Sequence, residues 1–258
     1  MAWSILGLII KVFYLKSVLP ETVTPEYVIS GILQGNIIGI YWFFIPLFCV
    51  YLSIPLFSAV SDEKKKDIFT YVCVVCFIIN ALVPFVLKVV PFDVGFSAVI
   101  RIGSGYLLFV LIGYLITKYD IPLAIRIVFY VLAIFGFILQ VIGTYFFSMK
   151  AGEIVSIFKG YENVPSILQS VGVFVFFKYI GSRIMKIGWI NILINFFSKY
   201  TFPLYLLHWY ILEMVLKEFS VEKTSMFFRL ATPFIALGIT VGITFLIRKV
   251  PVLRRILP

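Results

Sequence analysis

Apolar runs about as long as a membrane is thick recur along this chain. Residues 37–60 include YWFFIPLFCVYLSIPLF, and residues 127–147 carry no Asp, Glu, Lys or Arg. A helix satisfies its backbone polar groups internally, and about 20 apolar residues span the hydrocarbon core of a bilayer. A membrane β-barrel would need alternating apolar and polar residues, which these runs lack. The sequence therefore predicts an all-α fold, a polytopic bundle of transmembrane helices.

The composition excludes a soluble globular protein. Mean hydropathy is +1.09 and charged residues make up 13% of the chain, about half the share that is usual in soluble domains. The 258 residues leave room for about eight crossings with short connections. A net charge of +10 would suggest nucleic acid as the partner of a soluble protein. Here we expect no nucleic acid, because Lys and Arg mark the cytoplasmic loops of a membrane protein.

Hydropathy and charge together predict the topology. The predicted crossings are residues 2–19, 37–60, 68–90, 103–117, 127–147, 165–180, the helix that starts at 201, and 230–247. Taken together, the connections 61–67, 118–126 and 181–200 and the tail 248–258 carry more basic than acidic residues, whereas the other connections, taken together, are balanced. Eight crossings with both termini in the cytoplasm follow from this bias.

Smaller features complete the expected architecture of a multi-pass protein of the cell membrane. Residues 20–36 are expected to form an outer loop, and 181–200 a helix that lies in the inner interface. The glycines of 103–117 are expected to permit close helix contacts. Repeats and linkers are absent from the sequence, so residues 1–258 are predicted to form a single domain.

Neither a metal site nor a disulfide framework is expected. The three cysteines, Cys49, Cys73 and Cys76, all lie in apolar segments. The C-x-x-C spacing of the last two is better explained by helix packing than by redox chemistry, which would need a soluble thioredoxin-like setting. One histidine and few intramembrane acids make a transition-metal site improbable.

The only histidine of the chain lies in residues 201–212, TFPLYLLHWYIL. If Thr201 caps this helix, Pro203 falls in its first turn, where its missing N–H is harmless. Thr201, Tyr205 and His208 then share one stripe of the helix. An ionisable side chain at membrane depth indicates a functional site, but a helix-to-helix hydrogen bond would satisfy the imidazole equally well.

Four stretches, in the same order, resemble the acyltransferase-3 family. Residues 41–56, YWFFIPLFCVYLSIPL, look like its aromatic helix that ends in Tyr-Leu-x-x-Pro, and 105–116, GYLLFVLIGYLI, like its Gly-Tyr-rich helix. Residues 196–212, FFSKYTFPLYLLHWYIL, resemble its late helix with Ser, Tyr-Leu and His, and 249–257, KVPVLRRIL, its basic tail. Family members usually begin with two further helices, the first with an essential Arg and His, so the domain is expected to be N-terminally incomplete.

The resemblance implies an enzyme of the bacterial cell envelope. Members of the family are integral-membrane O-acyltransferases that move an acyl group, usually acetyl, from acyl-CoA to a hydroxyl of a cell-surface polysaccharide or related sugar. Acyl-CoA (acetyl-CoA) is then the donor substrate, no cofactor is bound, and the partners are membrane lipid and the sugar acceptor. Such a transfer needs a general base and groups that hold the donor. The oligomeric state is not predicted.

Within this family chemistry His208 is the candidate catalytic base, since it is the only imidazole. The candidate substrate-binding residues are Tyr205, Trp209, Arg101, Tyr106, Arg183 and Lys186. Each has a structural alternative: interfacial anchoring for Tyr205 and Trp209, the positive-inside bias for Arg183 and Lys186, and snorkelling for Arg101.

Two other classes of function stay open at this stage. Pro46 and Pro55 interrupt the apolar run 37–60, a weak form of the broken helices of transporters, so a transporter or flippase for lipid-linked sugars is one alternative. A non-catalytic membrane subunit is the other, because the helix with the family's Arg and His is not part of the sequence.

Overall fold

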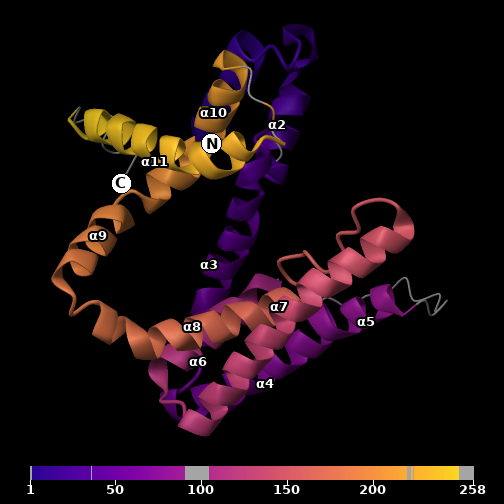
Figure 1. Ribbon diagram of the computed structural model, residues 1–258, viewed down its shortest axis with the longest axis vertical. Coiled ribbons are helices and arrows are strands. Elements are labelled where there is room, and N and C mark those ends of the chain that lie inside the picture. The colour runs from indigo at the N-terminus through magenta and orange to yellow at the C-terminus, as the bar shows by residue number, and fades with distance from the viewer. Residues whose placement is uncertain (1, 36, 91–104, 220–221, 223, 250–258) are drawn as a thin grey trace. The chain divides into compact units, whose positions relative to one another are not determined.

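The computed structural model describes residues 2–35, 37–90, 105–219, 222 and 224–249, and this part of the chain is helical (Figure 1). The chain divides into two compact units, which are described separately. Unit 1 comprises Met1–Ile45 and Ile187–Pro258, and unit 2 comprises Pro46–Lys186. The predicted all-α class is confirmed for the described residues, whereas the single-domain organisation stays a prediction.

Unit 1 is built from both ends of the chain. Its elements are α1 (Ala2–Ile9), a π-helix (Ile10–Tyr14), a 3₁₀ turn (Pro20–Thr22), α2 (Pro25–Gln34), a second 3₁₀ segment (Gly39–Phe43), α9 (Gly188–Ser198), α10 (Thr201–Glu218) and α11 (Met226–Arg248). The helix α3 (Phe44–Ser58) starts at the boundary between the units. The first and last parts of unit 1 pack together although 141 residues, 46–186, lie between them in the sequence. For example, Tyr41 donates a hydrogen bond to the carbonyl of Leu206 over a separation of 165 residues.

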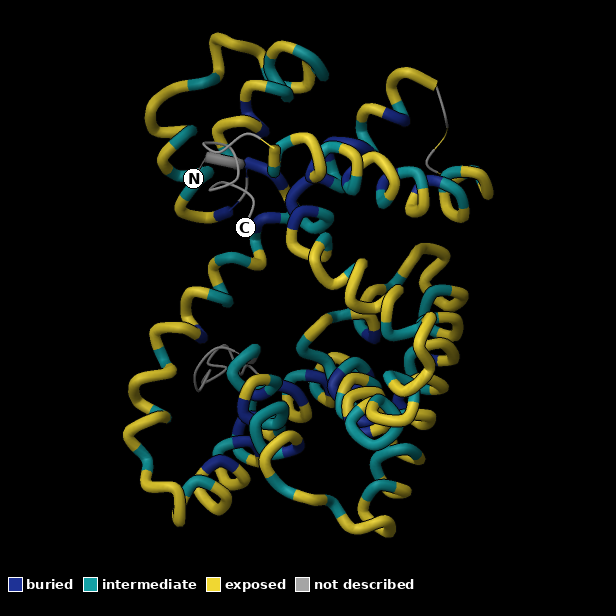
Figure 2. The backbone as a smooth tube through the Cα atoms, turned by 90° about the vertical axis from the view of Figure 1, so that its left-hand side faces the viewer, coloured by how far each residue is buried: buried dark blue, intermediate teal, exposed yellow. Residues whose placement is uncertain are grey.

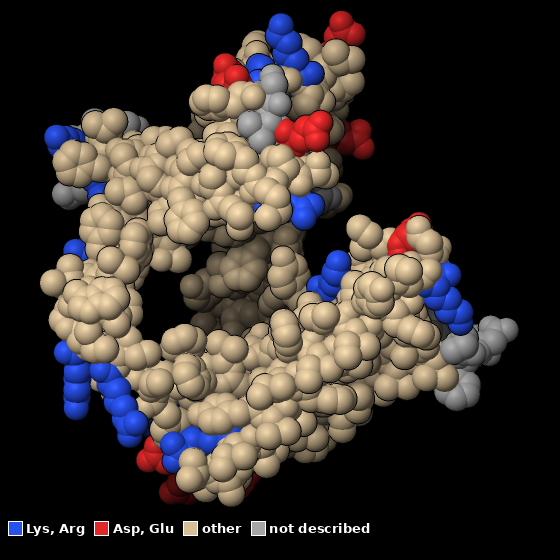
Figure 3. Space-filling view, viewed as in Figure 1, with Lys and Arg blue, Asp and Glu red and all other residues tan. Residues whose placement is uncertain are grey.

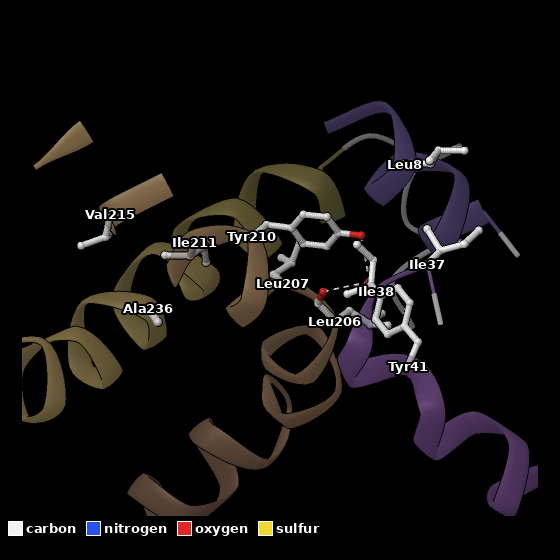
Figure 4. Packing of buried hydrophobic residues seen from close by; sticks show 10 residues of the cluster. All are labelled: Leu8, Ile37, Ile38, Tyr41, Leu206, Leu207, Tyr210, Ile211, Val215 and Ala236. Atoms are coloured by element: carbon white, nitrogen blue, oxygen red, sulfur yellow. Dashed lines mark hydrogen bonds between the residues drawn. The ribbon is translucent and has the colours of Figure 1, made fainter. Parts of the chain in front are cut away.

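The core of unit 1 joins α10 to the segment around residues 37–41 (Figure 4). Its buried members are Leu8, Ile37, Ile38, Tyr41, Leu206, Leu207, Tyr210, Ile211, Val215 and Ala236. The Tyr41 hydroxyl donates to the Leu206 carbonyl at 3.1 Å and lies 3.0 Å from the Tyr210 hydroxyl. Because the Tyr41 proton points at the carbonyl, Tyr210 is the donor in the second bond. This buried pair fixes one face of α10 against the N-terminal part of the chain.

Unit 2 is a bundle of long helices. Its remaining elements are α4 (Asp62–Cys76), a π-helix (Phe77–Leu82), α5 (Val83–Val89), α6 (Gly105–Lys118), α7 (Leu123–Ala151) and α8 (Val164–Ile184). The helices α7 and α8 approach closely at two glycines: a Cβ on Gly136 would lie 2.9 Å from the Pro165 carbonyl oxygen, and one on Gly172 would lie 2.8 Å from the Phe129 carbonyl oxygen. Small residues at helix contacts are the usual device for packing in lipid.

Five helical segments of the described chain are long and apolar enough to cross a membrane. They are Gly39–Ser58, Asp62–Val89, Leu123–Ala151, Val164–Ile184 and Met226–Lys249. Ser4–Tyr14, Tyr106–Lys118 and Gly188–Ser198 are apolar but shorter, and α10 carries Glu213, Lys217 and Glu218 near its end. A polytopic membrane protein is therefore supported, whereas eight crossings and cytoplasmic termini stay predictions.

The surface of the protein fits a lipid environment. Figure 2 shows buried residues as short patches between longer exposed stretches, and many of the exposed residues are large and apolar, such as Leu52, Phe137 and Phe234. On the face seen in Figure 3, Lys, Arg, Asp and Glu occupy small patches and uncharged residues cover the rest. Such a surface would be unfavourable in water and is matched by hydrocarbon chains.

Three local predictions differ from the structure. Residues 20–36 are not a loop throughout, because α2 occupies Pro25–Gln34: Thr24 caps it by accepting from the Tyr27 N–H, and Gly35 ends it at φ 66°. Thr201 does not cap α10 but is its first residue. The Thr201 hydroxyl instead donates to the Phe197 carbonyl, at 3.3 Å. The predicted interfacial helix 181–200 is divided, since α8 runs on to Ile184 and α9 starts at Gly188.

Candidate functional site

The imidazole of His208 is half-buried on α10, and Pro203 lies in the first turn of this helix as predicted. The Nδ1 atom of His208 lies 2.9 Å from the carbonyl oxygen of Leu204, one helical turn earlier. A carbonyl oxygen only accepts, so Nδ1 carries the proton in this hydrogen bond. In the neutral ring the lone pair is then on Nε2, which has no hydrogen-bond partner among the described residues. His208 is thus held in the tautomer that can accept a proton.

Tyr205 lies beside His208 on the same helix, with ring centroids 6.0 Å apart. Its hydroxyl donates to the carbonyl of Ile40, and its ring makes edge-on contacts with Phe43 and Phe44 at 6.0 and 5.8 Å. Tyr205 therefore ties α10 to the 3₁₀ segment Gly39–Phe43. Its ring lies beside the imidazole, and its hydroxyl is engaged in a structural hydrogen bond.

A polar cavity of about 580 Å³ lies on the next face of α10. It is lined by Lys11, Leu15, Ser17, Trp209, Glu213, Leu216 and Lys217. Trp209, the residue after His208, forms part of its wall, while the His208 ring is not among these lining side chains. At 100° per residue, Trp209 and Glu213 point away from the direction of His208 by roughly 100° and 140°. The cavity and the imidazole thus lie at neighbouring positions of α10 but on different faces of the helix.

Two lysines anchor the cavity to the N-terminal part of the chain. Lys11 donates to the carbonyl of Ile37 at 2.5 Å, and its ammonium lies 5.6 Å from the centre of the Trp209 ring. Lys217 donates to the carbonyl of Tyr14 and lies 3.9 Å from the centre of that residue's ring. Both cations are thereby fixed at the cavity wall, where they would attract an anionic group.

Sequence reasoning missed Lys11, Glu213 and Lys217 as site residues. The available signal was the presence of charged side chains within otherwise apolar helical runs, which by itself indicates a functional site in a membrane protein. Lys11 also lies in the π-helix Ile10–Tyr14, and π-helical turns are frequent at functional sites.

The other predicted site residues lie in unit 2 or outside the described residues. Tyr106 is half-buried in α6, Arg183 is exposed in the last turn of α8 and Lys186 is exposed just after it, so all three belong to unit 2. Arg101 lies outside the described residues. The structure therefore brings together Tyr205, His208 and Trp209 with Lys11, and their assignment to substrate binding or catalysis stays a prediction.

The described residues hold no group of three His, Cys, Asp or Glu that could bind a metal ion. The three cysteines, all in the described part of the chain, form no disulfide: Cys73 and Cys76 are buried, whereas Cys49 is exposed. What unit 1 offers is an imidazole with an available lone pair, an aromatic border and a neighbouring cavity with fixed cations. This set can serve proton transfer and the binding of an anion.

Comparison with protein families identifies the family of the chain. The family model described as "Acyltransferase domain" matches residues 1–249. The chain thus belongs to the acyltransferase-3 family, as the sequence motifs predicted. No curated protein and no solved structure matches it.

Proposed function

We propose that this protein transfers an acyl group, acetyl in the usual case, from acyl-CoA to a hydroxyl of a cell-surface or lipid-linked sugar. Membership of the acyltransferase family supports the reaction class. The observation that carries the proposal for this chain is the state of His208, whose Nδ1–H is engaged by the Leu204 carbonyl while Nε2 is available. The protein would act in the cell membrane, with membrane lipid around it.

His208 acts as the general base in this proposal. Nε2 takes the proton of the sugar hydroxyl while its oxygen attacks the carbonyl carbon of the thioester. The bond to sulfur breaks, the leaving thiolate of CoA takes the proton back from Nε2 to form the thiol, and an O-ester forms on the sugar. The hydrogen bond from Nδ1 to the Leu204 carbonyl orients the ring, so that Nε2 is the nitrogen available to take the proton.

The cavity beside Trp209 is proposed to hold the phosphates of the donor. Lys11 and Lys217 are fixed at its wall and would pair with them, while Trp209 gives an aromatic surface for stacking. Arg101, Tyr106, Arg183 and Lys186 remain proposed contacts to substrate.

The transfer is tested with membranes that contain the full chain and receive acetyl-CoA labelled in the acetyl group. We expect label in a sugar fraction, and we expect mild alkali to release it as acetate, because O-esters are cleaved under these conditions. Membranes without the chain are the control. Absence of alkali-labile label with every sugar acceptor from the host envelope would contradict the proposed function.

Replacement of Lys11 tests the binding of the donor. A Lys11→Met change removes a fixed cation, and loss of a charge-assisted contact of about 1.5–3 kcal/mol would raise the KM for acetyl-CoA roughly tenfold or more. The turnover number should change much less, since Lys11 is not proposed to touch the reacting atoms. The exposed Lys150, at the end of α7, gives the matched control Lys150→Met. An unchanged KM in Lys11→Met would remove this lysine from donor binding.

A further inference from the structure

Unit 2 contains an apolar groove between its membrane-spanning helices. Its volume is about 560 Å³, within the range of roughly 300–1,000 Å³ that is usual for sites that bind small ligands. Its walls are formed by residues of α4, α6, α7 and α8; Figure 1 shows where these helices lie in the bundle. The apolar wall includes Val74, Phe77, Leu115, Ile125, Phe129 and Val171. Three of these helices are long enough to cross the membrane, so an occupant would enter from the bilayer.

One end of the groove is polar, and it carries Lys66, Tyr119 and Asp120. Lys66 and Asp120 differ in whether they form a salt bridge. Asp120 lies 3.5 Å from the ammonium of Lys178, which also donates to the Tyr119 carbonyl at 2.7 Å. The ammonium of Lys66 lies 5.5 Å from the centre of the Tyr119 ring and forms no salt bridge in the described part of the chain.

The charge at this end is therefore cationic. Asp120 is paired with Lys178, whereas Lys66 is exposed and has no acidic partner among the described residues. The helix α7 also begins here, at Leu123, and the residue before it provides no side-chain cap, which adds the partial positive charge of a helix N-terminus. The distribution of Lys and Arg predicts this end of the bundle on the cytoplasmic side, where the anionic lipids of a membrane attract basic groups.

We propose that this groove is a binding site for one anionic phospholipid. One acyl chain lies along the apolar wall, and the phosphate of the headgroup pairs with Lys66. Three observations support an amphiphile from the bilayer as the occupant. The wall is apolar and matches hydrocarbon, and helices long enough to span the membrane border the groove. Lys66, the lining charge that forms no salt bridge among the described residues, is positive. The residues that line the groove all belong to unit 2, and the proposal does not depend on the proposed acyl transfer.

The proposal is tested by native mass spectrometry of the full chain in detergent. Phosphatidylglycerol and phosphatidylcholine with identical acyl chains are titrated separately. A lysine near an anionic lipid surface contributes about 1 kcal/mol, so we expect the wild type to retain phosphatidylglycerol about fivefold better than phosphatidylcholine. Lys66→Gln should abolish this preference. Lys64→Gln is the matched control, because Lys64 is exposed in the same basic run but does not line the groove, and it should leave the preference unchanged.

A second pair of variants tests the groove independently of charge. Val74 lines the groove and is 51% exposed, so Val74→Trp should fill the space and reduce retention of both lipids. Tyr71→Trp, on the same helix but outside the groove, should not. Equal retention of phosphatidylglycerol by the wild type, Lys66→Gln and Val74→Trp would overturn the proposal. Displacement of the lipid by equimolar palmitoyl-CoA would also overturn it and assign the groove to a fatty acyl donor.

Discussion

Replacement of His208 by Ala is expected to reduce ester formation from acetyl-CoA by about 100- to 10,000-fold, the usual contribution of a general base. The imidazole is the only one in the chain, so no second histidine can take its place. The protein should remain folded, because the ring is only half-buried and its hydrogen bond goes to a carbonyl of its own helix. The rate of release of alkali-labile acetate measures the effect, with thermal unfolding in detergent as the check on folding.

The variant His208→Asn distinguishes a base from a structural group. The side-chain amide of Asn can still donate to the Leu204 carbonyl, as Nδ1 of the imidazole does, but it has no basic nitrogen. If His208 is the base, Asn is as inactive as Ala. If the imidazole only stabilises α10, Asn retains activity while Ala loses it, and the proposed role of His208 is then wrong.

The helices of this protein were largely predictable because continuous hydropathy is a strong signal. The runs 127–147 and 230–247 appear in the structure as α7 and α11, with ends shifted by a few residues. The helix α2 was missed because it is marked by its ends and not by a long apolar run. Thr24 caps it, Pro25 lies in its first turn and Gly35 ends it. A prediction based on apolar runs of membrane length does not detect such a short helix.

The candidate site was predictable only along one helix. Tyr205, His208 and Trp209 follow from the pattern of α10 itself. Lys11 joins them through the fold, because its contacts are the Ile37 carbonyl and the Trp209 ring, 26 and 198 positions away along the chain. A pattern within one helix holds no information on which distant segment packs against it, so the cavity could not be derived from the sequence.

The same limit applies to helix contacts, and the glycines illustrate it. Glycines in 103–117 were expected to permit close helix contacts, but at Gly113, the glycine of this run whose surroundings are described, a Cβ would meet nothing within 4 Å. A close approach is found between α7 and α8, at Gly136 and Gly172. All three glycines look alike in the sequence, and only the partner surface decides which of them is required.

Gly172→Val is therefore expected to destabilise unit 2 strongly. A Cβ at this position would collide with the Cβ of Ala133 and lie 2.8 Å from the carbonyl oxygen of Phe129, which belongs to the α7 backbone and cannot rotate away. Overpacking typically costs about 1–3 kcal/mol, and a branched side chain between two helix backbones should reach the upper end of that range. At about 2–4 °C per kcal/mol, the melting temperature in detergent should fall by roughly 6 °C or more.

Gly181→Ala, on the same helix, is the matched control, because a Cβ there would meet nothing within 4 Å. Alanine forms helices better than glycine by about 1 kcal/mol, so this variant should melt at the same temperature as the wild type or higher. The two glycines thus have opposite expected effects although both lie in α8. Equal melting temperatures for Gly172→Val and the wild type would mean that α7 and α8 do not pack through this contact, and the walls of the proposed lipid groove would then need a different arrangement.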